Sequence, residues 1–163
     1  RDWSSDVCSS DLYLQGLGLQ RGDRVAVMLP NVPQYPVAVA GILRAGLVVV
    51  NVNPLYTPRE LEHQLKDSGA KAILILENFA ATLQQVVREV PVQHVVLAAM
   101  GDMLGLIKGP LVNHVVRKVK KMVPAFELPD AVSFKAALAR GRGQTLAPAG
   151  TGPDDIEIGR AHV

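Results

Sequence analysis

Four short apolar runs divide the first hundred residues. They are rich in aliphatic and β-branched residues without polar alternation, and they span 24–29, 47–52, 71–76 and 93–98. Runs of this kind are typical of strands buried on both faces of a sheet. Helical spacing of apolar residues appears between them, in 34–45, 58–67 and 78–89. Because strands alternate with helices over short connections, we predict an α/β fold with a partial doubly wound, mainly parallel sheet.

The clearest helix start lies just after the second run. Thr57 can act as the N-cap, Pro58 suits the first helical position, and Glu60 can reach back to the Thr57 amide. These residues form a capping box, and Leu61 and Leu65 then fall on one helical face. The sequence therefore predicts a buried strand that leads through a tight turn into a well-defined helix.

Single residues mark the other boundaries. Gly46 is expected to end the helix at 34–45, and Ser68-Gly69 the helix at 58–67. Asn78 is expected to cap a helix that runs to Glu89. The helix at 34–45 is predicted to pack on the sheet through a face of small residues, formed by Val37, Ala40, Gly41 and Arg44.

The pattern changes after residue 99. Residues 100–109 are expected to be irregular or weakly helical, 110–123 to form an amphipathic helix, and 133–138 a short capped helix. Residues 141–153 are rich in Gly and Pro and predict a connecting loop. Overall we divide the chain into alternating strand–helix (β/α) units at 13–99, a helical segment at 100–140 and a linker at 141–156.

The helix at 110–123 has an apolar side and a basic side. Leu111, Val115, Val119 and Met122 line the first; Arg117, Lys118, Lys120 and Lys121 crowd the second. One interpretation is a membrane-surface or acyl-chain-facing element across 103–123, since basic amphipathic helices favour anionic interfaces. The other is a surface helix with a solvated basic face. We favour the second, because four cations are few for stable anchoring.

Both ends differ from the rest of the chain. Residues 1–12 hold its single Trp and single Cys. One choice of codons for residues 6–12 has a reverse complement that encodes 157–163, and the string resembles a sequencing-library adapter. We therefore expect 1–12 and 157–163 to be adapter-derived artefacts. The remaining 13–156 contains no cysteine, so neither a disulfide nor a thiol nucleophile is expected in it.

Composition excludes several function classes. The hydrophobic content of 48% suits a globular core. The aromatic content of 4% argues against a base-stacking surface, so no nucleic-acid partner is expected. No apolar run reaches membrane-spanning length.

Motif searches identify no catalytic, cofactor-binding or metal-binding residue. Gly16, Gly18 and Gly22 have the wrong spacing and position for a dinucleotide loop, and no P-loop motif occurs. The histidines are interpreted as structural: His63 as exposed, His94 as the start of a strand, and His114 as part of the basic helix. Asp154-Asp155 is interpreted as solvated charge, and Arg140–Gly143 as a flexible loop.

Three stretches carry a family resemblance: Gly22-Asp-Arg-Val-Ala-Val-Met-Leu-Pro-Asn31, Gly41-Ile-Leu-Arg-Ala-Gly46 and Asn51-Val-Asn-Pro-Leu-Tyr-Thr-Pro58. They resemble the amino-terminal domain of bacterial long-chain fatty acyl-CoA synthetases, in the adenylate-forming, AMP-binding superfamily. The resemblance covers roughly 13–156, and the third stretch points most narrowly to the long-chain branch.

The resemblance implies a parent ligase that uses ATP and Mg²⁺ to form an acyl-adenylate, then passes the acyl group to coenzyme A. It also implies a cytoplasmic enzyme at the periphery of the inner membrane, and leaves a homodimer open. The family's nucleotide loop would follow a segment like Gly152-Pro-Asp-Asp-Ile156, so no catalytic residue is transferred to this chain, which is expected to be inactive alone. Residues 51–56 are expected near the active-site face of the sheet, or to form a structural turn.

Two alternatives stay open. One is a free-standing α/β domain that binds a small ligand at the carboxyl ends of its strands. The other is a fragment of an acyl-activating relative with a different carboxylic acid substrate.

Overall fold

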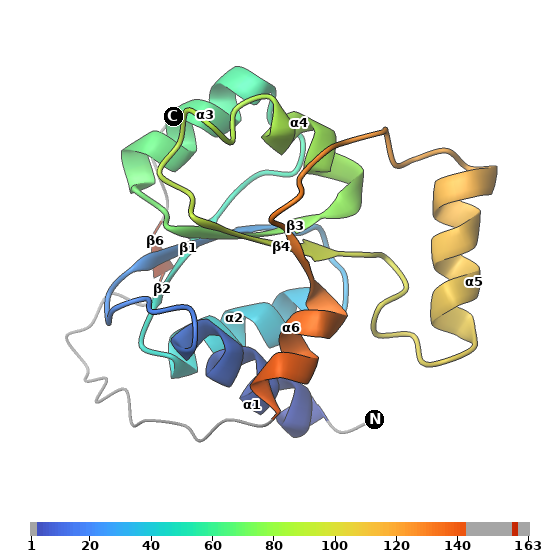
Figure 1. Ribbon diagram of the computed structural model, residues 1–163, viewed down its shortest axis with the longest axis horizontal. Helices are drawn as coiled ribbons and strands as arrows, with labels where there is room; N and C mark the ends of the chain where they lie inside the picture. The colour runs from blue at the N-terminus through green and yellow to red at the C-terminus, as the bar shows by residue number, and fades with distance from the viewer. Residues whose placement is uncertain (1–2, 143–157, 160–163) are drawn as a thin grey trace.

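A computed structural model describes residues 3–142 and 158–159 as helices on both faces of one parallel sheet (Figure 1). The strand order is β5-β4-β3-β1-β2-β6, and every neighbouring pair is parallel. The strands are β1 (Arg24–Met28), β2 (Val48–Asn51), β3 (Ala72–Leu76), β4 (His94–Ala98), β5 (Val132–Ser133) and β6 (Ile158–Gly159). The prediction of a doubly wound parallel sheet is confirmed.

Helices cover the two faces unequally. The helices are α1 (Trp3–Gln15), α2 (Gln34–Arg44), α3 (Pro58–Ser68), α4 (Ala80–Gln84), α5 (Lys108–His114) and α6 (Phe134–Gly141). In Figure 1, α3 and α4 lie above the sheet, and α1, α2 and α6 lie below it. A 3-10 turn, η1 (Glu77–Phe79), follows β3, and a π-helical turn, η2 (Val115–Val119), continues α5.

Alternate residues of each strand enter two separate cores. Along β1, Val25 and Val27 pack with α2 and α6, whereas Ala26 and Met28 pack with α3. All four are at most 1% exposed. Burial on both faces explains why the strands have unbroken apolar sequences.

The helix boundaries around β2 agree with the sequence prediction. Thr57 Oγ1 accepts a hydrogen bond from the Glu60 amide at 3.4 Å, and Glu60 Oε2 accepts one from the Thr57 amide at 2.8 Å. These bonds complete the predicted capping box. Gly69 ends α3 with a φ of 62°, and Gly46 follows α2 with a φ of 76°. Glycine suits both positions because it adopts left-handed backbone conformations without strain.

The predicted helix at 78–89 is wrong in its cap and its length. Only α4 (Ala80–Gln84) is α-helical in this range, and turns continue from there to Glu89. Asn78 makes no capping bond; its Nδ2 instead donates to the Met122 carbonyl at 3.0 Å. A distant partner therefore outcompetes the local cap.

The predicted packing face of α2 is also only partly right. Val37 and Gly41 are buried, together with Gln34, Ala38 and Ile42, whereas Arg44 is exposed and Ala40 is half-buried. Gly41 faces α1, where a Cβ would collide with Ser10. The small residue therefore allows a close helix contact within the layer.

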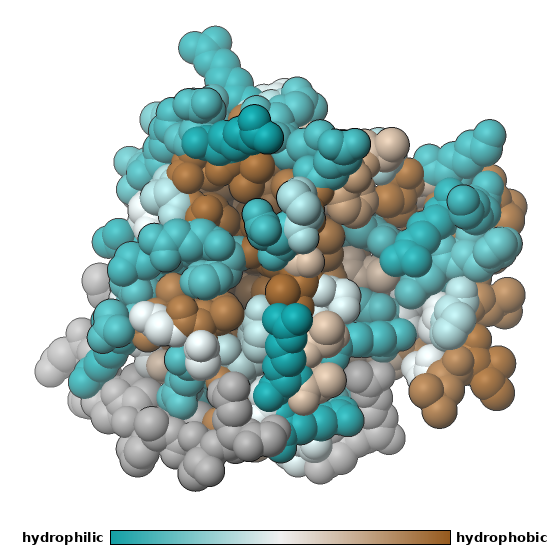
Figure 2. Space-filling view, viewed as in Figure 1, coloured by the Kyte–Doolittle hydropathy of each residue, from teal (hydrophilic) through white to brown (hydrophobic). Residues whose placement is uncertain are grey.

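The segment after β4 departs most from the prediction. Helical structure spans Lys108 to Val119, not 110–123, and the predicted apolar side faces outward: Leu111, Val119 and Met122 are exposed. Gly109, Asn113 and Val116 form the buried side instead. Figure 2 shows the result as brown surface at the right-hand edge, beside teal side chains.

The predictions for residues 133–142 are partly right. Ser133 caps α6 as predicted, accepting from the Ala136 amide at 3.3 Å. The two-residue strand β5 was not predicted. Arg140–Arg142 are not a flexible loop: Arg140 and Gly141 belong to α6, and Gly141 packs on the Ser9 carbonyl. The rest of the predicted linker, 143–156, lies outside the described residues.

Candidate functional site

The carboxyl ends of the strands form the edge at which this fold offers a site. Ligands of open parallel sheets bind outside the carboxyl ends of the strands. The chain leaves β2, β3 and β4 at this edge, and one polar residue near each exit makes defined contacts: Asn51, Glu77 and Asp102.

Asn51 joins three elements at the end of β2. Its Oδ1 accepts a hydrogen bond from the Tyr35 hydroxyl of α2 at 2.9 Å, and its carbonyl accepts one from Gln64 Nε2 of α3 at 2.9 Å. In the turn that follows, Asn53 Oδ1 accepts from the Leu55 amide at 3.0 Å. The segment 51–56 thus lies at the carboxyl edge, where its polar groups stabilise the turn.

Glu77 pairs with Arg117 beyond the end of β3. Its carboxylate side chain is 7% exposed and accepts hydrogen bonds from Arg117 Nε and Nη2 at 2.6–3.0 Å. This hydrogen bonding raises the pKa of the Arg117 guanidinium. A charged pair of this geometry fixes the position of η2 relative to the sheet.

Asp102 organises the turn after β4. Its buried Oδ2 accepts from the Ala99 amide at 2.8 Å, and its Oδ1 lies 3.5 Å from Lys135 Nζ of α6. In the same turn, the Gly101 amide donates a hydrogen bond to Asn113 Oδ1 of α5 at 2.7 Å. The turn is thus bonded to both α5 and α6.

Two open cavities lie at this edge. One, of about 410 Å³, is lined by Glu77, Arg117, Lys118 and the segment 123–126. The other, of about 450 Å³, lies beside Asp102, Lys135 and Arg142. The two carboxylates at these cavities already face Arg117 and Lys135, so their charges serve to hold elements together.

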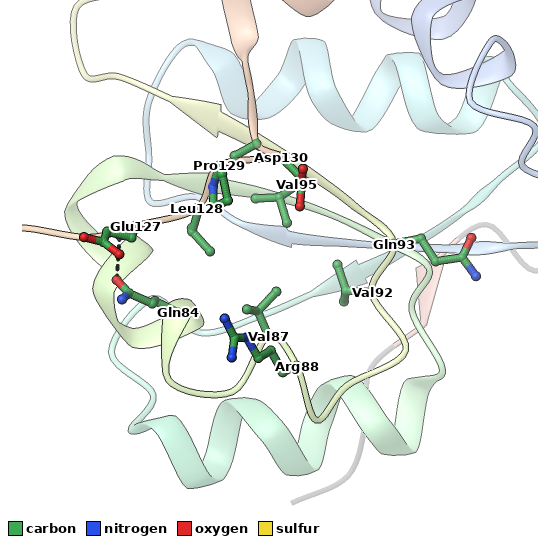
Figure 3. A pocket seen from close by; sticks show the side chains of 11 residues that line it. Gln84, Val87, Arg88, Val92, Gln93, Val95, Glu127, Leu128, Pro129 and Asp130 are labelled. Carbon is green, nitrogen blue, oxygen red and sulfur yellow. Dashed lines mark hydrogen bonds between the residues drawn. The ribbon is translucent and has the colours of Figure 1, made fainter.

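A larger cavity, of about 630 Å³, lies at the opposite end of the sheet (Figure 3). Gln93, in its wall, directly precedes β4, and Ala131 directly precedes β5. Gln84 Oε1 accepts from the Glu127 amide at 2.8 Å across it. Because it lies at the amino ends of the strands, this cavity is not where a ligand of this fold is expected.

The residues weighed as candidates from the sequence do not come together. His63 is exposed on α3, His94 begins β4, and His114 is exposed on α5. Asp154-Asp155 lies outside the described residues. Among residues 3–142 and 158–159, no group of three or more His, Cys, Asp or Glu side chains is arranged to hold a metal ion.

Sequence reasoning missed the Glu77–Arg117 and Asp102–Lys135 pairs. Glu77 follows a buried strand directly, which is a signal that it lies at the carboxyl edge. No comparable signal marks Arg117, which is 40 residues away and resembles its basic neighbours.

Comparisons with known proteins agree on one family. The family described as AMP-binding enzyme matches residues 6–142. The chain is 60% identical to a long-chain-fatty-acid–CoA ligase of Escherichia coli O157:H7 over 145 aligned residues. The alignment covers 88% of this chain and 26% of that relative. It is 65% identical over 130 residues, 79% of this chain and 23% of the relative, to a protein of the same description from Salmonella typhimurium. The chain thus spans about a quarter of the length of these relatives.

Solved structures share the fold. An anthranilate CoA ligase in complex with anthranoyl-AMP matches with a TM-score of 0.72 at 19% identity, over 96% of this chain and 25% of that one. A long-chain-fatty-acid-CoA ligase from Archaeoglobus fulgidus matches with a TM-score of 0.57 at 22% identity, over 68% and 22%. Within the described residues, no helix has both the length and the apolar character needed to cross a bilayer. The match over 6–142 shows that the chain belongs to the AMP-binding enzyme family.

Proposed function

We propose that the chain is part of the amino-terminal domain of a long-chain fatty acid–CoA ligase. The observation that carries the proposal is identity of 60–65% to relatives of that description over most of the chain. The aryl-acid ligases among the solved structures are only 19–21% identical, so they support the fold and not an aryl substrate.

The parent enzyme would catalyse two steps. The fatty acid carboxylate displaces pyrophosphate from ATP to form an acyl-adenylate, and the coenzyme A thiol then displaces AMP to form the thioester. ATP, Mg²⁺ and coenzyme A are therefore the proposed cofactors of the parent.

The described residues do not by themselves fit these groups. Glu77 and Asp102, the buried carboxylates at the carboxyl edge, are paired with Arg117 and Lys135, so neither is a free Mg²⁺ ligand. We therefore assign no catalytic, cofactor or metal role to a residue of this chain. Its role is to hold the sheet edge on which the site is built.

We propose that segment 51–56 forms part of the active-site face of the parent. Asn51 lies at the carboxyl edge of the sheet, bonded to Tyr35 of α2 and Gln64 of α3. Ligands of open parallel sheets bind outside this edge, which supports the proposal. The nucleotide loop of the parent would follow residue 156 and is not assigned to any residue of this chain.

We also propose that 1–12 and 157–163 are adapter-derived. The polar face of α1 supports this: Asp6, Ser9, Ser10 and Asp11 are at most 5% exposed, although a helix packed in a core normally presents apolar residues there. The pairing of β6 with β2 is compatible with an adapter origin of 157–163. An edge strand pairs through backbone N–H and C=O groups, which any sequence supplies.

For the parent we propose a cytoplasmic location at the periphery of the inner membrane, with contact through 103–123 and a homodimer both left open. Function is tested by fatty-acid-dependent exchange of pyrophosphate into ATP, using the full-length protein from the source gene. We expect exchange with a long-chain saturated acid, little with benzoate, and none from the 163-residue chain alone. Preference for benzoate would reject the long-chain assignment, and exchange by the chain alone would reject its proposed inactivity.

A further inference from the structure

The cavity of about 630 Å³ lies between the turns that follow α4 and the segment 127–131 (Figure 3). Cavities that bind small ligands commonly measure ~300–1,000 Å³ and combine an apolar lining with a few polar groups that fix the orientation of the ligand. This one lies at the amino ends of β4 and β5, whereas the substrates of the fold's own reaction are expected at the carboxyl ends. A ligand of this cavity would therefore differ from the substrates proposed above.

Aliphatic side chains form the floor of the cavity. They are half-buried and pack against the core on the α3 side of the sheet, and they are Val87, Val92, Val95 and Leu128. Because their inner sides contact the core, the floor is held in place and presents apolar surface to the cavity. An aliphatic occupant is favoured there, since its binding removes apolar area from water on both partners.

Hydrogen bonds hold the wall opposite α4. Gln84 Oε1 of α4 accepts a hydrogen bond from the Glu127 amide at 2.8 Å, which joins α4 to the segment 127–131. Within this segment the Ala131 amide donates to the Leu128 carbonyl at 3.1 Å. The cavity is thus formed before a ligand binds, and a small ligand does not have to order its walls.

Charges of opposite sign flank the floor. Arg88, Glu127 and Asp130 are exposed at the rim, and none of their charged groups has an ion-pair partner within the described residues. In Figure 3, Arg88 lies at the lower end of the labelled side chains and Asp130 at the upper end. An occupant with an anionic group at one end and a cationic group at the other would therefore meet complementary charges.

This lining fits an extended zwitterion better than a ligand with one charge. An aliphatic anion that pairs with Arg88 would leave both carboxylates beside its apolar end, and an aliphatic amine that pairs with the carboxylates would leave Arg88 without a partner. A dipeptide with free termini carries its ammonium and carboxylate groups at opposite ends. Its two side chains lie between these ends, where they can cover the aliphatic floor.

We propose that this cavity is a binding site for a short aliphatic peptide with free termini. The carboxylate of the peptide pairs with Arg88, its ammonium group pairs with Glu127 and Asp130, and its side chains lie on the aliphatic floor. The inference goes beyond the proposed ligase function and does not depend on it, because binding of the peptide requires neither ATP nor a fatty acid.

The test is a heteronuclear NMR titration of the isotope-labelled 163-residue chain with L-leucyl-L-leucine. We expect saturable shifts that cluster in the amides of 84–95 and 127–131. The variants R88Q and E127Q/D130N should each weaken binding about tenfold, because each removes charge-assisted hydrogen bonds to one end of the peptide. The substituted side chains are exposed, so the spectrum of each free variant should show an intact fold.

Matched ligands separate the contributions of the floor and the two ends. Glycylglycine keeps both charges but lacks aliphatic side chains, and it should bind at least about tenfold more weakly. L-leucyl-L-leucinamide lacks the carboxylate, so R88Q should weaken binding of leucyl-leucine but not of the amide. N-acetylation removes the ammonium group and should make binding insensitive to E127Q/D130N.

Matched variants test for a general effect of surface charge. Arg59 and Asp67 are exposed on α3, away from the cavity, so R59Q and D67N should leave binding of leucyl-leucine unchanged.

Four outcomes would overturn the proposal. They are the absence of saturable shifts, shifts centred on 51–56 at the carboxyl edge, equal binding by glycylglycine, and tighter binding by the leucinamide than by leucyl-leucine. The last result would identify the ligand as a cation and not a zwitterion. Each outcome leaves the ligase assignment intact, because pyrophosphate exchange by the full-length protein tests that assignment separately.

Discussion

Arg117 donates through Nε to both carboxylate oxygens of Glu77 at 3.0 Å, and through Nη2 to Oε2 at 2.6 Å. The two residues are 40 positions apart in sequence. The Arg117 side chain is 49% exposed, whereas that of Glu77 is 7% exposed. Their pairing connects the outlying α5–η2 segment to the carboxyl edge of the sheet.

We predict that Glu77→Gln lowers the free energy of unfolding by about 1–2 kcal/mol, because the amide cannot accept both parallel hydrogen bonds and carries no charge. The half-exposed guanidinium is partly solvated, so the loss stays below that of a fully buried pair. Urea unfolding followed by circular dichroism measures it.

Glu62→Gln is the matched control. Glu62 pairs with Lys66 one helical turn away, at 2.6 Å on the surface of α3. Water screens an exposed pair of this kind, so Glu62→Gln should change the free energy of unfolding much less than Glu77→Gln does. Equal losses in the two variants would mean that the Glu77–Arg117 pair has no special structural role.

The strands and α3 could be predicted because local sequence determines them. Unbroken aliphatic runs specify strands covered on both faces, and the predicted boundaries are within one residue for β1, β3 and β4. The capping box of Thr57 and Glu60 is complete within four consecutive residues, so no distant contact is needed to form it.

The orientation of α5 could not be predicted because it depends on distant contacts. Periodicity identifies Leu111 and Val119 as members of one apolar row but does not say which way that row faces. Gly109 and Asn113 pack inward because they fit against Gly101. Asn78 is similar: its bond to Met122 spans 44 residues, and nothing local signals it. The pairing of Glu77 with Arg117 was missed for the same reason, because Arg117 lies 40 residues away and nothing near it in the sequence marks it as the partner.

A second prediction concerns the turn between β2 and α3. Thr57→Ala removes the acceptor for the Glu60 amide and should lower the free energy of unfolding by about 1 kcal/mol. Thr57→Ser keeps the hydroxyl and should restore most of the loss. Thermal unfolding compares the variants, and equal effects of Ala and Ser would show that the cap does not stabilise α3.

A third prediction concerns acid stability. Lys71 Nζ lies 2.8 Å from Asp23 Oδ1. Burial alone would raise the pKa of Asp23, but hydrogen bonds from Lys71 and the Gln20 amide outweigh it and lower the pKa below its usual value. The ionised Asp23 thus stabilises the fold above the unfolded-state pKa of about 3.9, and this contribution is lost as pH falls through the folded-state pKa.

Lys71→Met should therefore destabilise the chain at neutral pH, by less than about 1 kcal/mol because Lys71 is partly exposed. The difference from the unsubstituted chain should shrink below about pH 4, as Asp23 becomes protonated in both proteins. Urea unfolding at neutral and acidic pH measures it. A difference that does not change with pH would show that packing of the lysine stem, and not charge, is responsible.

Asp11 should have the opposite pH dependence. Its side chain is fully buried in α1, and burial raises its pKa more than the hydrogen bond from the Leu12 amide and the Arg44 charge lower it. Between the unfolded-state pKa of about 3.9 and the raised folded-state pKa, the folded state binds more protons, so stability falls as pH rises.

Asp11→Asn should therefore raise the free energy of unfolding at pH 7, by an amount that diminishes as pH is lowered toward about 4. Urea unfolding at several pH values measures the difference. Arg44→Gln, which removes the neighbouring charge but not the carboxylate, should instead destabilise the chain at pH 7. A gain from Asp11→Asn that is the same at pH 4 and 7 would contradict the raised pKa. A gain confined to higher pH would mean that an ionised carboxylate occupies a core position ill suited to it, as expected if residues 1–12 did not evolve with the rest of the fold.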